Sequence, residues 1–174
     1  MTPEAPPPRT TRTERLRIEK AEMRRSFETY RKFHGRLEKI QALRNREEIL
    51  EEARTIASRM VEAAASIVFL QDEKSAEYSP HIEQIPDAFA PHLDPVGNEL
   101  IQWAFKNRTV SSVPIDAPDL NARGIQTQIL VPLISPRNDH GVLILWSPSE
   151  ITHLSQIELD MLSTLGRVTG IQIE

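Results

Sequence analysis

The sequence predicts an α+β fold: an antiparallel sheet packs one face against the first and last helices of a domain and leaves its other face to an irregular middle segment. Three observations predict this arrangement. Stretches with a helical period begin and end the apolar part of the chain, short β-branched runs come in pairs, and a segment with three prolines separates the pairs. With 174 residues, of which 39% are hydrophobic and 26% charged, the chain suits one domain of ordinary size with an appendage.

The appendage is the N-terminal part, whose charge differs from that of the rest. Residues 1–36 hold ten Lys/Arg and five Asp/Glu, whereas the remainder holds eleven and twenty. Residues 1–13 carry four prolines and no apolar period, which is typical of a disordered tail. Residues 14–45 are expected to form a basic helix.

A heptad trace within residues 14–45 favours a coiled coil. Apolar or aromatic residues recur every seven positions, and two companions follow three residues later; the set is Leu16, Met23, Tyr30 and Leu37, with Phe33 and Ile40. We interpret these six residues as candidates for a helix that joins two copies of the chain. The alternative is a helix that docks on its own domain.

Residues 46–174 are expected to form the domain itself. Its first helix starts after Asn45, a suitable N-cap, and small residues on its apolar face allow close approach to a sheet. The run SIVFLQD and the weaker run AEYSPHI then predict a hairpin over residues 66–81.

The middle of the domain is expected to be irregular. Residues 83–95 predict a loop, and a second helix is expected from Asp94 to Asn107, with Trp103 among its inward side chains. A short strand in TVSSVPID follows, and then a connection that has room for one helical turn.

The stretch TQILVPLISPRNDHGVLILWS predicts a central hairpin. Its turn ends at Gly141, which can adopt a left-handed conformation, so residues 142–146 are expected to return antiparallel to residues 129–134. Ser155 then caps a final helix of about 18 residues, with Ile157 in its apolar stripe. One face of the first hairpin strand is expected to be core, and it comprises Ile125, Thr127, Ile129, Val131 and Leu133.

Three stretches in this order resemble the GAF domain family over residues 46–174. REEILEEARTIASRMVEAAASIVFLQD is similar to the family's first helix and strand, and LIQWAFKNRTVSSVPID to a helix that ends just before a strand and an Asp-containing loop. ILVPLISPRNDHGVLILWS, followed by LSQIELDMLSTLGRVTGIQIE, is similar to the closing hairpin and helix. The resemblance implies a PAS-like layer with a roughly six-stranded antiparallel sheet, in a regulatory module that is commonly dimeric through its terminal helices. Many members of the family sense a small molecule between the sheet and the loops on its far face, whereas others are dimerising scaffolds.

The sequence lacks the residues that several activities of the family require. Without cysteine there is no thiolate zinc site, no thiol nucleophile and no bilin attached through sulfur, and the family's cyclic-nucleotide signature is not found. His92 with Asp94, and Asp139 with His140, supply too few ligands for a metal ion. With no glycine-rich phosphate loop and no nucleophile paired with a base, we expect no cofactor, no metal and no enzymatic activity.

Charge and hydropathy bear on the partners and the location. The basic N-terminal arm is interleaved with Glu14, Glu19 and Glu22, which compensate its charge on a helix surface, so nucleic-acid binding is not expected. The longest nearly apolar stretch, Ala63 to Leu70, is far shorter than the roughly 20 residues of a membrane-spanning helix. A cytoplasmic protein without a membrane span is therefore predicted.

Five polar residues are candidates for a ligand pocket. Gln126 and Gln128 fall on the face of the hairpin strand that is opposite to the core face, and Ser111, Asp116 and Arg123 flank the loop expected to cover that side. The alternative is that these side chains satisfy the backbone groups of the loop itself.

The function expected from the sequence is that of a sensory or regulatory domain that forms a homodimer through its helices. It would relay a signal to a partner protein or to an output domain that follows residue 174. Two alternatives are a ligand-free dimerisation scaffold and a small-molecule-binding effector domain of a transcription regulator. The sequence names no ligand.

Overall fold

The computed structural model describes residues 12–72, 78–81, 89, 91, 99–148 and 154–174. The chain forms two compact units, Met1–Gly35 and Arg36–Glu174. The first unit contains most of helix α1 (Arg12–Ala42). No helix among the described residues is long and apolar enough to cross a membrane.

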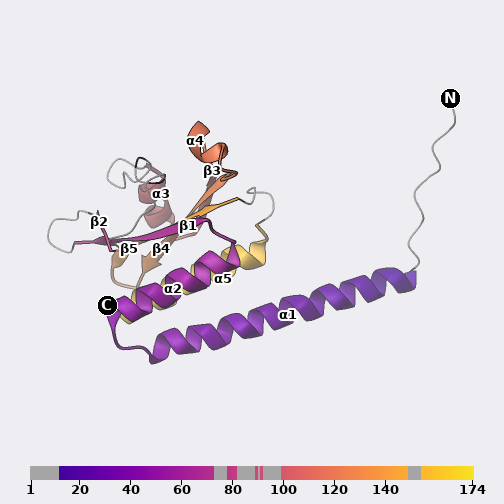
Figure 1. Ribbon diagram of the computed structural model, residues 1–174. Helices are drawn as coiled ribbons and strands as arrows, with labels where there is room; N and C mark the ends of the chain where they lie inside the picture. The colour runs from indigo at the N-terminus through magenta and orange to yellow at the C-terminus, as the bar shows by residue number, and fades with distance from the viewer. Residues whose placement is uncertain (1–11, 73–77, 82–88, 90, 92–98, 149–153) are drawn as a thin grey trace. The chain divides into compact units, whose positions relative to one another are not determined.

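The second unit holds the remaining elements and the end of α1 (Figure 1). In chain order these are α2 (Arg46–Met60), β1 (Ala65–Gln71), β2 (Tyr78–Pro80), α3 (Glu99–Asn107), β3 (Ser111–Pro114), α4 (Pro118–Asn121), β4 (Thr127–Ile134), β5 (Asp139–Ser147) and α5 (Gln156–Ile173). The predicted hairpin over residues 66–81 and the predicted central hairpin are both confirmed, each as an antiparallel pair. The predicted Asp94 N-cap and the loop over residues 83–95 lie outside the described residues, apart from Phe89 and Pro91.

The described strands form one antiparallel sheet in the order β2-β1-β5-β4-β3. This is the predicted α+β layer, with five strands among the described residues where about six were expected. The two longest strands, β4 and β5, are adjacent near the middle, and every residue of β5 after Asp139 is buried. Near-continuous burial of this kind is typical of a strand that is covered on both faces.

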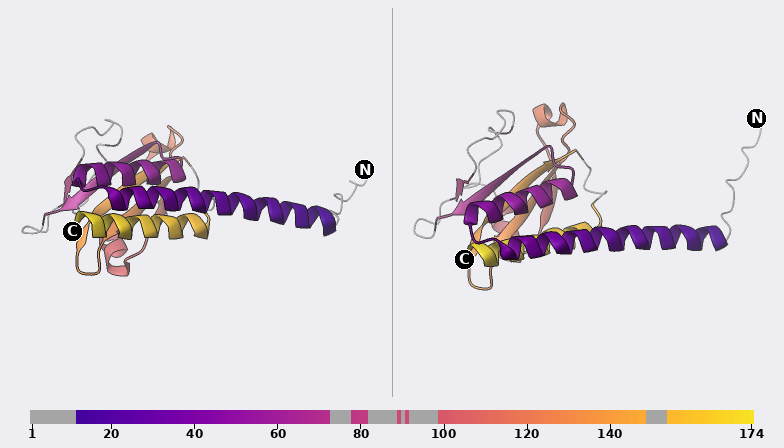
Figure 2. Two further views of the ribbon diagram at one scale, coloured as in Figure 1. Left: turned by 90° about the horizontal axis from the view of Figure 1, so that it is seen from below. Right: turned by 60° about the horizontal axis from the view of Figure 1, so that its bottom comes forward.

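Helices α2 and α5 lie on one face of the sheet, as the views in Figures 1 and 2 show. Both begin at the predicted caps: the Asn45 side chain accepts a hydrogen bond from the Glu47 backbone N–H, and Ser155 forms a capping box with Glu158. Two glycines determine how closely α5 approaches the sheet. A Cβ atom on Gly166 would lie 2.4 Å from the Pro132 carbonyl oxygen, and one on Gly170 would lie 2.4 Å from that of Ile134. Helix α5 therefore touches the backbone of β4 directly.

Helices α3 and α4 lie on the opposite face, which we call the outer face (Figure 1). Helix α3 buries Ile101, Ala104 and Phe105, which share one side at helical spacing. Trp103 lies about 200° around the helix axis from Ile101, on the side opposite to the buried residues, and is 50% exposed, so its expected inward position is wrong. Ile157, in the first turn of α5, is also half exposed and not part of the buried stripe, because it lies outside the side of the helix that carries the buried residues from Met161 onward.

Two further details of the central hairpin differ from the prediction. Ile125 packs in the outer-face cluster and not on the helix side, because β4 begins only at Thr127 and the Ile125 N–H bonds to Leu120 at the end of α4. Gly141 does not have a positive φ; among the described glycines only Gly124 does. Gly141 is needed for space, since a Cβ atom there would lie 2.1 Å from the Phe69 carbonyl oxygen of β1.

Helix α1 includes all six predicted heptad residues. Three of them are buried, namely Phe33, Leu37 and Ile40, whereas Met23 and Tyr30 are exposed. Leu16 lies in the helix. Phe27, which the heptad trace did not include, is also exposed. The helix therefore has a buried stripe near its C-terminal end and an exposed one before it.

Candidate functional site

The outer face of the sheet is the candidate site, and strand register defines which residues form it. In an antiparallel pair, residues directly opposite each other point to the same face. One row across the sheet is Val113, Gln128, Trp146 and Ala65, and the next is Ser111, Leu130, Ile144 and Ile67. These two rows form the middle of the outer face.

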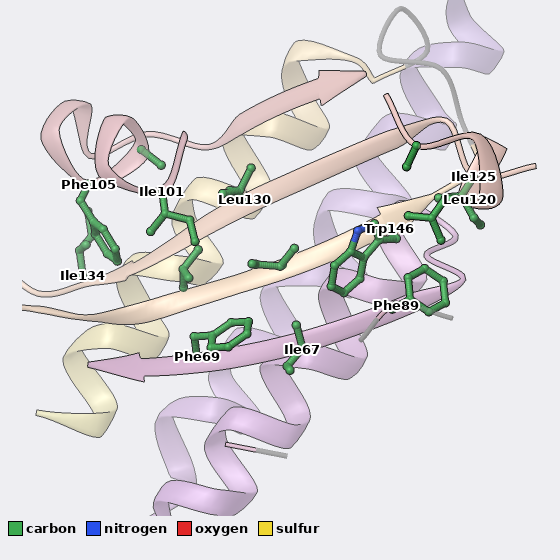
Figure 3. Close-up of a cluster of buried hydrophobic side chains, with 14 residues drawn as sticks. Ile67, Phe69, Phe89, Ile101, Phe105, Leu120, Ile125, Leu130, Ile134 and Trp146 are labelled. Atoms are coloured by element: carbon green, nitrogen blue, oxygen red, sulfur yellow. The ribbon is translucent and has the colours of Figure 1, made fainter. Parts of the chain in front are cut away.

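Apolar side chains from several elements cover these rows (Figure 3). The cluster brings together three strands, α3, α4 and Phe89; its members are Ile67, Phe69, Phe89, Ile101, Ala104, Phe105, Ala117, Leu120, Ile125, Leu130, Ile134, Val142, Ile144 and Trp146. The Trp146 and Phe89 rings lie side by side with centroids 5.1 Å apart. Trp146 is a core residue, with an exposed fraction of 1%.

Two of the five predicted pocket residues lie on this apolar face. Gln128 is half-buried and pairs in register with Trp146. Ser111 is buried beside Leu130, and its hydroxyl has no hydrogen-bond partner among the described residues. A buried hydroxyl without a partner costs free energy, so this group is available to an incoming donor or acceptor.

The other three predicted residues lie at the end of the sheet near α4, and all are exposed. Asp116 precedes α4 and Arg123 follows it. The Gln126 backbone bonds to the strands on either side, through its N–H to Ser147 and its carbonyl to the Ile115 N–H, and its side chain is exposed. The structure therefore separates the five candidates into an inner pair and an exposed group of three.

A polar group that the sequence did not indicate lies at the opposite end of β5. Tyr78 stacks on Phe105 with ring centroids 5.7 Å apart, and Arg108 Nη1 lies 3.2 Å from Asp139 Oδ1. Burial, and to a lesser degree the Asp139 carboxylate, raises the pKa of Tyr78 to about 12. Arg108 also donates to the Ser135 carbonyl, which ties the end of α3 to the β4–β5 turn. No sequence signal marks this group, because 31 residues separate Arg108 from Asp139.

Two surface hollows are lined by described residues, and neither includes a predicted pocket residue. One, of about 520 Å³, is lined by Lys39, Leu43 and four glutamates of α2. The other, of about 310 Å³, lies between the β4–β5 turn and α5 and is lined by Arg108, Arg167, Ser135 and apolar neighbours. Within the described part of the chain, no group of three or more His, Cys, Asp or Glu side chains could hold a metal ion.

The outer face presents a few polar groups on an apolar surface. Its described side chains supply apolar surface, one hydroxyl and one amide, which can enclose and orient a small molecule by burial and hydrogen bonding.

Comparison with known proteins identifies the fold. The model of the GAF domain family matches residues 45–174. None of the curated proteins matches the chain.

Solved structures resemble the chain at low sequence identity. The GAF domain of the cyanobacteriochrome TePixJ is 20% identical, with a TM-score of 0.58 over 77% of this chain and 92% of that one. The GAF domain of a two-component sensor histidine kinase from Bacillus halodurans is 16% identical, with a TM-score of 0.56 over 75% and 95%. The GAF domain of an Acinetobacter phosphoenolpyruvate-protein phosphotransferase is 15% identical, with a TM-score of 0.58 over 84% and 91%. At these identities the likeness shows the fold alone.

Proposed function

The chain belongs to the GAF domain family, and on that premise we propose that it is a non-enzymatic sensory or regulatory domain. It dimerises through its helices and relays a signal to a partner protein or to a fused output domain. Domains of sensor kinases and photoreceptors share its fold, which supports a signalling role. The observation that carries the proposal is the inner pair, Ser111 and Gln128, on an otherwise apolar sheet face.

Strand β4 supplies a route for the relay. Its Gln128 and Leu130 belong to the outer face, while the carbonyl groups of Pro132 and Ile134 meet Gly166 and Gly170 of α5. A ligand that shifts β4 from the outer side therefore shifts the surface on which α5 rests. Because the two glycines leave no space between the backbones of β4 and α5, a small displacement of the strand also displaces the helix.

The ligand-free scaffold is the second candidate, and a specific observation favours it. Trp146, Phe89 and Phe105 already fill much of the outer face with their rings. A face packed in this way stabilises the domain without any ligand. The effector domain of a transcription regulator would share the site and differ only in its output.

Native mass spectrometry of the 174-residue chain tests the proposal. We expect the wild type to carry a small molecule after purification, and the double variant Ser111→Ala with Gln128→Leu to lose it while remaining folded. The matched control is Asp116→Ala, an exposed member of the predicted set, which should keep the molecule. A bare mass for the wild type, purified from several expression hosts, would favour the scaffold.

A further inference from the structure

Helix α1 exposes an apolar and aromatic stripe within the first unit of the chain. Met23, Phe27 and Tyr30 have exposed fractions of 72%, 66% and 49%, and His34 is exposed as well. The Tyr30 and His34 rings touch, with centroids 4.5 Å apart. We call these four residues the aromatic stripe. A surface of this kind on a charged helix marks a contact with another molecule.

The spacing of the aromatic stripe is that of a coiled coil. Its members follow one another by four, three and four residues, which places Met23 and Tyr30 at d positions and Phe27 and His34 at a positions. The heptad pattern predicted from the sequence instead placed the second apolar residue of a repeat three positions after the first. Of those second residues, Phe33 is only 4% exposed and is not free to meet a second helix.

The charges beside the aromatic stripe select the partner and its direction. In this register the e positions are Arg17, Arg24 and Arg31, all exposed. An antiparallel pair of these helices would set that basic column against itself, whereas a parallel pair sets e against g. By sequence the g positions are 19, 26 and 33, none of which is basic, so a parallel pair does not set the basic column against another basic column.

We propose that the aromatic stripe joins two copies of this chain in a parallel, in-register pair, with Phe27 at its centre. The inference rests on the dimeric part of the proposed function and assigns the residues, the register and the direction. Lys20 and His34 occupy a positions at the two ends of the stripe, where polar residues lower the stability of the pair and favour two strands. Since the stripe spans only two heptads, the dimer is weak and depends on concentration.

Single-cysteine cross-linking of the full chain tests the register, because the natural sequence has no cysteine. Two cysteines form a disulfide only when their Cα atoms lie within roughly 7 Å. We expect Phe27→Cys and Met23→Cys to form covalent dimers under mild oxidation on the order of tenfold faster than Thr29→Cys, an exposed c position that lies away from the seam. Equal rates at positions 29 and 27 would overturn the register.

A test of whether the two helices run parallel or antiparallel requires a sample in which two cysteine variants are mixed. In a parallel pair Met23→Cys links to itself, whereas in an antiparallel pair over the same stripe, where d positions face a positions, it links to a His34→Cys chain. A mixed Met23→Cys and His34→Cys sample that yields mainly the mixed dimer would overturn the parallel direction, yet leave dimerisation intact.

Sedimentation equilibrium separates this inference from the proposed function. Phe27→Glu should raise the dissociation constant of the dimer by about tenfold or more, because it buries two like charges at the seam. Thr29→Glu, an exposed position off the stripe, should change it little. An unchanged dimer in Phe27→Glu would overturn the inference alone. A wild type that is monomeric at every concentration would overturn the inference and the dimeric part of the function together.

Discussion

The two faces of the same sheet are held in different ways. On the helix side, Gly166 and Gly170 bring α5 against backbone carbonyl groups of β4, and the Ser147 hydroxyl donates to the Val61 carbonyl over 2.6 Å. On the outer side, contacts are made by the rings and branched tips of residues from α3, α4 and Phe89. Backbone contacts cannot rearrange without moving a whole element, whereas side chains can repack. The helix side is therefore suited to be scaffold and the outer side to respond to a ligand.

The largest effect is expected on the outer face, at Trp146. Replacing this 1% exposed side chain with alanine removes the centre of the cluster, and should lower the free energy of unfolding by about 4 kcal/mol. Trp103→Ala is the matched control, because that ring is 50% exposed and its loss should cost about 0.5 kcal/mol. Chemical denaturation measures both. Similar losses for the two variants would show that the outer face is not a packed core.

The next largest effect is expected on the helix side, at Gly170. Alanine raises helix propensity by about 1 kcal/mol, but its Cβ meets backbone atoms of Ile134 at 2.4 to 2.5 Å, and overpacking of this kind costs about 3 kcal/mol. The free energy of unfolding of Gly170→Ala should therefore be lower than that of the wild type by about 2 kcal/mol. Gly35→Ala is the control, since its Cβ has nothing within 4 Å and only the gain in propensity remains. If Gly170→Ala were as stable as the wild type, the close approach of α5 to β4 would be wrong.

The pH dependence of the free energy of unfolding should show the raised pKa of Tyr78. Its pKa in the folded protein is about 12, above the ordinary value of 10, so the fold favours the protonated phenol. That contribution is fully present below pH 10 and is lost as the pH rises from 10 to 12. Tyr78→Phe should therefore flatten the decline of unfolding free energy over this interval. Parallel slopes for the variant and the wild type would contradict the assignment.

The smallest effects on stability are expected at two serines, one on each face of the sheet. The Ser147 hydroxyl on the helix side has a partner, so Ser147→Ala should cost about 1 kcal/mol. The Ser111 hydroxyl has none among the described residues, so Ser111→Ala should be neutral or stabilising by about 0.5 kcal/mol in the ligand-free protein. Equal costs for the two substitutions would remove the distinction between a satisfied scaffold and an unsatisfied binding face.

Local signals in the sequence predicted the elements and their ends well. Asn45 and Ser155 cap their helices as expected, because a cap depends on a few neighbouring residues. The alternation along β4 placed Gln128 on the outer face, where the structure has it, because a strand fixes the direction of its own side chains.

Contacts between distant segments could not be predicted in this way. The space needed at Gly166 and Gly170 depends on how deeply α5 sits on β4, and no pattern within α5 encodes that distance. Likewise, the heptad trace located α1 and included Met23 but missed the exposed Phe27. It also did not show that Phe33 is buried, since burial depends on tertiary packing. Whether Ser111 and Gln128 bind a ligand stays a prediction.

Amide hydrogen exchange on the whole chain tests the difference between the two faces most directly. Elements that respond to a ligand open more readily than the scaffold that carries them. We predict that amides of α5 exchange only by global unfolding, whereas those of α3 exchange at least about tenfold faster through local opening. Equal protection of α3 and α5 would contradict the account, because the outer face would then be as fixed as the helix side.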